Sequence, residues 1–254
     1  DRINKDWSYK VRGFFSWSDN KQIKVDYDQG LKGTYRDPNG RSTDMGFLGL
    51  KSMGILRTQA DLDALLEKNP AYTIYGQKPQ VGMVYYQDVR GAKSATPDAN
   101  GNYSYAEADG KIDDNDLQYL TNKKDNHFGF GLNFATTYKK LSFSFNLGGS
   151  FGGQDIMESG ARSWGTSAQV NAITNLPVHL VDHWTVDNPN AKYPAPAFRA
   201  QNGYDSDFWF VSSFTLAVRT LNVSYELPQT LAQKLNINSA RVYLTATNPL
   251  NLYN

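Results

Sequence analysis

The chain has 254 residues, no cysteine and a formal net charge of +1 at pH 7. A charge so close to zero argues against a nucleic-acid partner, and the lack of cysteine excludes both a disulfide framework and thiolate chemistry. No apolar run is long enough to form a membrane-spanning helix. The mean hydropathy is negative, which is also expected of membrane strands because every second residue of such a strand is polar.

The first predicted strand runs from Trp7 to Trp17, where large apolar residues alternate with a second face of Ser8, Lys10, Arg12, Phe14 and Ser16. Successive side chains of a strand point to opposite faces, so Trp7, Val11 and Trp17 are expected on one face. The sequence at 18–21 is typical of a turn, and residues 22–27 are expected to return as a second strand.

A long polar segment follows, from residue 28 to about residue 126. Inside it, Thr58 is expected to cap a short helix that extends to Glu67, with Asp61 three residues after the cap. Residues 82–87 are expected to form a short strand. Most of this segment is therefore predicted to be a large loop.

The strongest pattern in the chain is a pair of alternating runs, Phe128–Tyr138 and Leu141–Phe151, joined by only two lysines. Such a short link predicts an antiparallel hairpin. A tilted strand needs about 9–11 residues to cross a bilayer, and both runs have this length. One face of the hairpin is rich in aromatic residues and the other is small and polar, which predicts one face toward lipid and one toward a wet lumen.

The remaining elements repeat this arrangement. A polar loop is predicted at 152–207, a strand at 208–227 ended by Pro228, a short helix or turn at 229–235, and a last strand at 240–247. Short and long links thus alternate along the chain. Bacterial outer-membrane barrels have short periplasmic turns and long extracellular loops.

These elements predict an all-β protein, a partial transmembrane antiparallel β-barrel with long extracellular loops. The strands, about six or seven, are too few to close a wide barrel, and an open sheet edge is not tolerated in lipid. The chain also begins without a methionine or signal peptide and ends within a strand region. We therefore expect residues 1–254 to be one segment of a single barrel domain in the outer membrane, with the other strands outside this chain.

Several segments, in this order and spacing, are similar to the C-terminal part of SusC/RagA-like TonB-dependent outer-membrane transporters of Bacteroidota. The resemblance covers most of the chain from about Gly46 onward. The segments are residues 85–88, 109–116, 128–132, 138–139, 147–152, 183–194, 220–228 and 235–243. The plug domain, the TonB-engaging motif and the final strands expected of this family are not in the sequence.

The resemblance implies a roughly 22-stranded barrel with a plugged lumen. It also implies active import of glycans or peptides, with a SusD-like surface lipoprotein as a lid and with energy supplied through TonB. The resemblance therefore implies a transporter and not an enzyme. Two alternatives stay open: a passive porin-type or adhesive outer-membrane barrel, and a secreted calcium-binding β protein that binds glycans.

One motif carries metal chemistry, because residues 109–116 match the second half of a twelve-residue calcium loop. The matching positions are Asp109, the turn glycine Gly110, the carbonyl of Lys111, Asp113 and Asp116, with Glu107 as a further ligand. Tyr105 stands at the first position of the motif, where a carboxylate is needed.

The family pattern resembles Asp-x-Asn-Gly-Asp-Gly-x-Ile-Asp-x-x-Asp, which suggests that an insertion of roughly residues 90–105 separates Asp88 from the rest of the loop. Asp88 is then the candidate for the first ligand. The converging carboxylates would repel one another without a cation, which favours a calcium ion that rigidifies the loop. The alternative is a polar turn without an ion.

Two further patterns are weaker candidates for chemistry. His179 and His183 have a spacing that suits zinc on a helix, but the glutamate of a metalloprotease motif is missing. Asp205 and Asp207, next to aromatic residues, are candidates for glycoside hydrolysis, although acidic loops are also common on exposed surfaces.

Overall fold

The computed structural model describes residues 5–162, 181–234 and 236–253. The chain divides into two compact units, each described here by itself. The sheet unit consists of Asp1–Asp19, Asp125–Gly153 and Ser212–Asn254. The loop unit consists of Asn20–Lys124 and Gln154–Val211.

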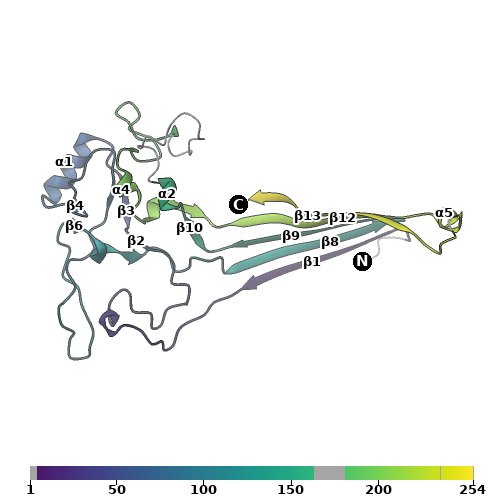
Figure 1. The fold of residues 1–254 in the computed structure, drawn as a ribbon, viewed down its shortest axis with the longest axis horizontal. Helices are drawn as coiled ribbons and strands as arrows, with labels where there is room; N and C mark the ends of the chain where they lie inside the picture. The colour runs from purple at the N-terminus through teal and green to yellow at the C-terminus, as the bar shows by residue number, and fades with distance from the viewer. Residues whose placement is uncertain (1–4, 163–180, 235, 254) are drawn as a thin grey trace. The chain divides into compact units, whose positions relative to one another are not determined.

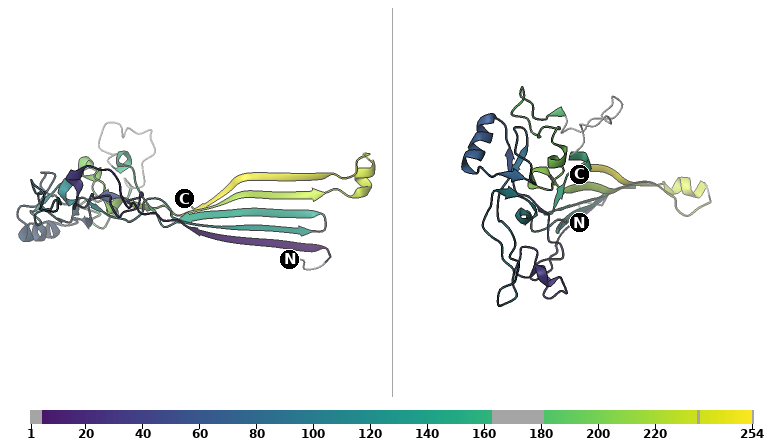
Figure 2. Two further views of the ribbon diagram at one scale, coloured as in Figure 1. Left: turned by 90° about the horizontal axis from the view of Figure 1, so that it is seen from below. Right: turned by 60° about the vertical axis from the view of Figure 1, so that its left-hand side comes forward.

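The sheet unit is one five-stranded antiparallel sheet in which the strands lie in chain order, β1-β8-β9-β12-β13. Figure 1 shows these long strands side by side, and the left view in Figure 2 shows their colours changing from purple to yellow across the sheet. Their bounds are β1 Trp7–Trp17, β8 Phe128–Tyr138, β9 Leu141–Phe151, β12 Thr215–Glu226 and β13 Arg241–Tyr253.

The register of the sheet confirms the predicted hairpin and its two faces. Phe128 pairs with Phe151, Phe134 with Phe145 and Tyr138 with Leu141, so these three pairs join large side chains on one face. The rings of Phe134 and Phe145 stack with their centroids 5.4 Å apart. Asn133 pairs with Asn146 on the opposite face.

All short turns lie at one end of this sheet. The turn after β8 is only Lys139 and Lys140, and Lys139 has a positive φ of 53°, which fits a tight hairpin turn. The link after β12 contains the short helix α5 Gln229–Lys234, seen at the end of the yellow strands in Figure 2. The long links after β1 and β9 leave the sheet at its other end, where Trp17, Phe128 and Phe151 pair in one row.

The prediction of a strand at 22–27 is wrong. Trp17 is the last strand residue, and β1 pairs directly with β8 over all of its residues. Gln22 instead bonds with a turn, because its N–H donates to the Arg41 carbonyl at 2.7 Å and its carbonyl accepts from Gly40 at 2.9 Å. Residues 18–127 are thus one long connection. The end of β1 at Trp17 therefore leads into a long link, and not into the short turn predicted at 18–21.

Two other strands differ in extent from the prediction. The segment predicted as one strand at 208–227 is divided into the 3-10 helix η3 Asp207–Trp209, the short strand β11 Phe210–Ser212 and β12. The last strand continues past Pro249, because β13 is at the edge of the sheet and a proline without an N–H is tolerated there.

The apolar face of the sheet has no core beneath it in the described residues. Among the buried apolar residues of the described chain, only Ala217 and Ala232 belong to the sheet unit. By contrast, Phe15 and Val242 are each 63% exposed and Leu244 is 70% exposed. So large an apolar face normally marks contact with a partner or a membrane.

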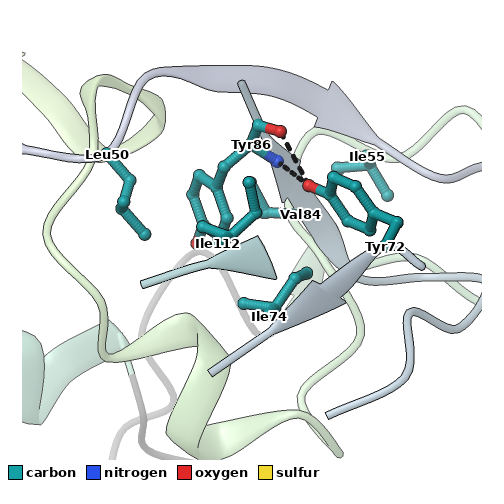
Figure 3. Close-up of a cluster of buried hydrophobic side chains, with 7 residues drawn as sticks. All are labelled: Leu50, Ile55, Tyr72, Ile74, Val84, Tyr86 and Ile112. Atoms are coloured by element: carbon teal, nitrogen blue, oxygen red, sulfur yellow. Dashed lines mark hydrogen bonds between the residues drawn. The ribbon is translucent and has the colours of Figure 1, made fainter. Parts of the chain in front are cut away.

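The loop unit carries the compact core, shown in Figure 3. The cluster consists of Leu50, Ile55, Tyr72, Ile74, Val84, Tyr86 and Ile112. The buried Tyr72 hydroxyl donates to the Tyr86 carbonyl at 2.7 Å and accepts from the Tyr86 N–H at 2.8 Å, so it satisfies both backbone groups at a strand edge.

Short elements frame this core. Its strands form two-stranded ladders, β2 with β7, β3 with β5, β4 with β6 and β10 with β11, of which β4 and β6 are parallel. The strand bounds are β2 Leu48–Gly49, β3 Ser52–Ile55, β4 Thr73–Ile74, β5 Val84–Tyr86, β6 Lys111–Ile112, β7 Gln118–Tyr119 and β10 Gln154–Ile156. The helical elements are η1 Gln29–Leu31, α1 Gln59–Lys68, η2 Asp114–Asp116, α2 Ser159–Arg162 and α4 Arg199–Asn202.

Helix α1 confirms the predicted cap. The Thr58 side chain accepts from the Asp61 N–H at 3.2 Å, and the Asp61 carboxylate accepts from the Thr58 N–H at 2.9 Å. These bonds from Thr58 lower the pKa of Asp61. No helix in the described part of the chain is long and apolar enough to cross a membrane.

Candidate functional site

The predicted calcium loop lies in the loop unit, where two segments distant in sequence meet. We call Asp88 together with residues 109–116 the acidic turn. The residues between them fold back as a hairpin, since the Gly91 N–H donates to the Ala106 carbonyl at 2.9 Å and the Ser94 N–H to the Ser104 carbonyl at 2.8 Å. The inserted segment therefore loops out and returns Asp88 to the motif.

Carboxylates and backbone amides hold the two segments together reciprocally. Asp88 Oδ2 accepts from the Gly110 N–H at 2.6 Å. From the other side, Asp116 Oδ1 accepts from the Val89 N–H at 2.8 Å and from the Arg90 N–H at 3.2 Å. Gly110 has a φ of +83°, a conformation that favours glycine at this turn.

The other members of the motif bond locally or are exposed. Asp109 accepts from the Lys111 N–H at 2.9 Å, and Asp113 accepts from the Asn115 N–H at 2.7 Å as the cap of η2. Glu107 is exposed, as is the Lys111 side chain. Asp116, by contrast, is fully buried.

Asp88 is the unusual carboxylate of the acidic turn. Burial raises its pKa, and the negative charges of Asp116 and Asp109 raise it further against the lowering effect of the Gly110 N–H. Its Oδ1 atom is buried and has no hydrogen-bond partner in the described residues. A cation at this atom would satisfy the oxygen and lower the repulsion.

The donor set suits calcium in kind, because it consists of carboxylate and carbonyl oxygens. Most of these carboxylates already accept backbone N–H groups, however. In the part of the chain that the structure describes, no cluster of three or more His, Cys, Asp or Glu side chains is arranged to hold a metal ion. Calcium binding at Asp88 and the motif stays a prediction.

A groove of about 790 Å³ adjoins the acidic turn within the loop unit. Its lining includes Leu65 and Lys68 of helix α1 together with Tyr72, Tyr85 and Asp88. The groove therefore combines aromatic surface with charges of both signs.

The structure gives Asp205 and Asp207 separate structural partners. Asp205 pairs with the guanidinium of Arg162 at 2.6 Å, and Asp207 pairs with Lys51 and accepts from the Ser52 N–H at 2.7 Å. Each carboxylate is thus bound to its own cation. His179 lies outside the described residues, so the candidate zinc pair is not seen.

The polar face of the sheet unit holds a second hollow, of about 390 Å³. Its lining includes Lys10, Arg12, Asn133, Ser144, Asn146 and Asn222. The alternation of β1 already placed the two cations on the polar face, but it did not indicate a site. The signal available in the sequence was that mid-strand charges are rare and these two lie on one face.

No protein-family model and no curated protein matches the chain. Solved structures do match its fold. The RagAB peptide importer in the closed-closed state matches with a TM-score of 0.64 and 16% identity, over 100% of this chain and 25% of the other. The same importer in the open-open state matches with a TM-score of 0.66 and 16% identity, over 100% of this chain and 24% of the other.

A further structure of the RagAB peptide transporter matches at 18% identity with a TM-score of 0.62, over 99% of this chain and 24% of the other. The chain thus spans about a quarter of the length of the solved chains it matches. At this identity the likeness concerns the fold. It confirms the all-β antiparallel architecture and agrees with the resemblance inferred from the sequence segments.

Proposed function

We propose that this chain is part of the barrel wall of an outer-membrane importer for glycans or peptides. The observation that carries the proposal is the five-stranded sheet, whose strands are long enough for a bilayer and whose apolar face is exposed. The fold likeness to the RagAB peptide importer extends over the whole chain and supports the same role.

In this proposal the two faces of the sheet have different surroundings. Trp7, Phe15, Phe145 and Leu244 contact lipid, while the small and polar residues of the other face contact the lumen. The loop unit is extracellular, because the long links leave the sheet at one end and such loops are outside in this class of barrel. A calcium ion at the acidic turn would fix the conformation of this loop unit.

The proposed import is active transport. A SusD-like lipoprotein closes the extracellular side as a lid, and TonB supplies energy through parts of the protein outside this chain. The RagAB structures are of a peptide importer, which supports import as the general role.

Uptake in the native bacterium tests this function. Deletion of the gene should abolish uptake of a glycan or peptide that the wild type imports, and loss of TonB should have the same effect. Uptake that continues without TonB would support a passive porin instead. Recovery of the full-length protein from the medium without detergent would support the secreted β protein and contradict the proposal.

A further inference from the structure

All charges within the long strands lie on the polar face of the sheet unit. They are Lys10, Arg12, Arg219, Glu226 and Arg241. Arg219 is the extra residue of a β-bulge. Its side chain lies on the polar face, as shown by Gly148 on that face: a Cβ atom on Gly148 would be 3.7 Å from the Arg219 Cγ atom. Four of these five side chains are cationic, so the face is electropositive.

The cations differ in whether they have a partner. Arg241 faces Glu226 at 3.9 Å near the short-turn end of the sheet. Lys10 and Arg12 have no ion pair in the described residues, and both line the 390 Å³ hollow. Their side chains are exposed and point to the same face, two residues apart, so their charges add in the hollow.

Two rows of residues, polar except for Ala135, extend across the sheet from these cations. One row runs Arg12, Asn133, Asn146 and Thr220, and the other runs Lys10, Ala135, Ser144 and Asn222. The Asn146 amide donates to Asn133 Oδ1, which leaves the Asn133 amide hydrogens without a partner in the described residues. Thr245 in turn donates to Asn222 Oδ1 at 2.7 Å. The hollow therefore offers charged and neutral donors together.

This combination suits a carboxylate group. Arginine and lysine donate to carboxylates through charge-assisted hydrogen bonds, and amide N–H groups can complete the shell.

We infer that Lys10 and Arg12 form a carboxylate-binding site on the lumen wall, which favours anionic cargo over neutral cargo. The inference rests on the proposed importer function and adds a substrate class to it. The carboxylate can belong to an acidic peptide or to a uronate-containing oligosaccharide, since both present the same group.

Binding to the purified full-length transporter tests the inference. The probes are an aspartate-rich peptide with its asparagine isostere, and an oligogalacturonate with its neutral methyl ester. The wild type should bind one acidic probe about tenfold tighter than its neutral partner, the effect of roughly one charge-assisted hydrogen bond. The probe pair that shows the preference identifies the source of the carboxylate, and high salt should weaken that preference.

The variants Lys10→Gln and Arg12→Gln should each reduce the preference, and the double variant should remove it. Arg241→Gln is the matched control, because it removes a cation from the same face outside the hollow. The charge-keeping variant Lys10→Arg with Arg12→Lys should retain most of the preference.

A wild type that binds acidic and neutral probes equally would overturn the inference, and so would a double variant with an unchanged preference. The double variant could instead lose binding to acidic and neutral probes alike and melt at a lower temperature. In that case the two cations stabilise the folded protein rather than bind the cargo, which also overturns the inference. TonB-dependent uptake of neutral cargo by the double variant would show that the importer function stands independently of this result.

Discussion

Among single residues, those of the acidic turn give the clearest chemical prediction, which is a stability that depends on calcium. Calcium should raise the melting temperature of the full-length wild type, because a cation satisfies the buried Asp88 Oδ1 atom and reduces repulsion from Asp116 and Asp109. Asp88→Asn and Asp109→Asn should remove this response while keeping an acceptor for the backbone N–H groups. Identical melting curves with calcium and with EDTA in all three proteins would contradict the calcium site.

The same site predicts a pH dependence. The pKa of Asp88 is raised above its ordinary value, so its carboxylate takes up a proton at a higher pH than a free aspartate does. A protonated carboxyl is a poor calcium ligand. The calcium-dependent rise in melting temperature should therefore shrink as the pH falls through the raised pKa of Asp88, before ordinary aspartates protonate.

Two adjacent glycines in β9 give a matched test of packing. A Cβ atom on Gly149 would lie 2.4 Å from the Phe130 ring and 2.5 Å from the Thr215 carbonyl oxygen, whereas on Gly148 its nearest neighbour is at 3.7 Å. Gly149→Ala should therefore destabilise the assembled barrel by about 1–3 kcal/mol, and Gly148→Ala should have little effect. Urea unfolding of the full-length protein measures both. Equal losses in the two variants would refute the described packing of β9.

At the element scale, the two faces of β9 predict opposite responses to the same substitution. Phe143 pairs with Thr136 and Val223 on the apolar face, and Ser144 pairs with Ala135 and Asn222 on the polar face. Phe143→Arg should cost about 2–4 kcal/mol near the middle of the membrane, and Ser144→Arg should be far milder. The measurement is the amount of full-length protein assembled in the outer membrane. Similar amounts for both variants would argue against the assigned faces.

The sequence was informative where alternation is long and uninterrupted. The hairpin from Phe128 to Phe151 and the Thr58 cap follow from local patterns, so both were predicted with nearly the observed bounds. The supposed strand at 22–27 has a suitable composition, but strand pairing is decided by distant partners. The eleven residues of β1 pair with β8, more than a hundred residues away, which no local pattern reveals.

The acidic turn shows the same limit on a smaller scale. The motif at 109–116 was visible in the sequence, and the return of Asp88 followed only from the family pattern. The reciprocal bonds between Asp88 and Gly110, and between Asp116 and Val89, depend on how the inserted hairpin folds back. The Lys10 and Arg12 hollow likewise needed the pairing of β1 with β8 and β9.

Taken as a whole, the described long-stranded sheet is open at both sides and does not close into a barrel. Both outer strands of the sheet, β1 and β13, have a free edge in the described chain, and the solved chains of similar fold are about four times as long. In a membrane these edges must be paired, so further strands of the full-length protein are expected beside them. The proposed role of the sheet is therefore to separate lipid from an aqueous lumen.

Cysteine scanning of β9 in the assembled full-length protein can distinguish the two faces, because the 254-residue chain contains no cysteine of its own. Single cysteines at 142–147 would be labelled with a water-soluble maleimide, and a fluorescent label at each would be tested for quenching by nitroxide lipids. Accessibility should alternate with a period of two: residues 142, 144 and 146 react from water, and residues 143, 145 and 147 are quenched from lipid. Labelling without alternation, or no lipid quenching at any position, would contradict it.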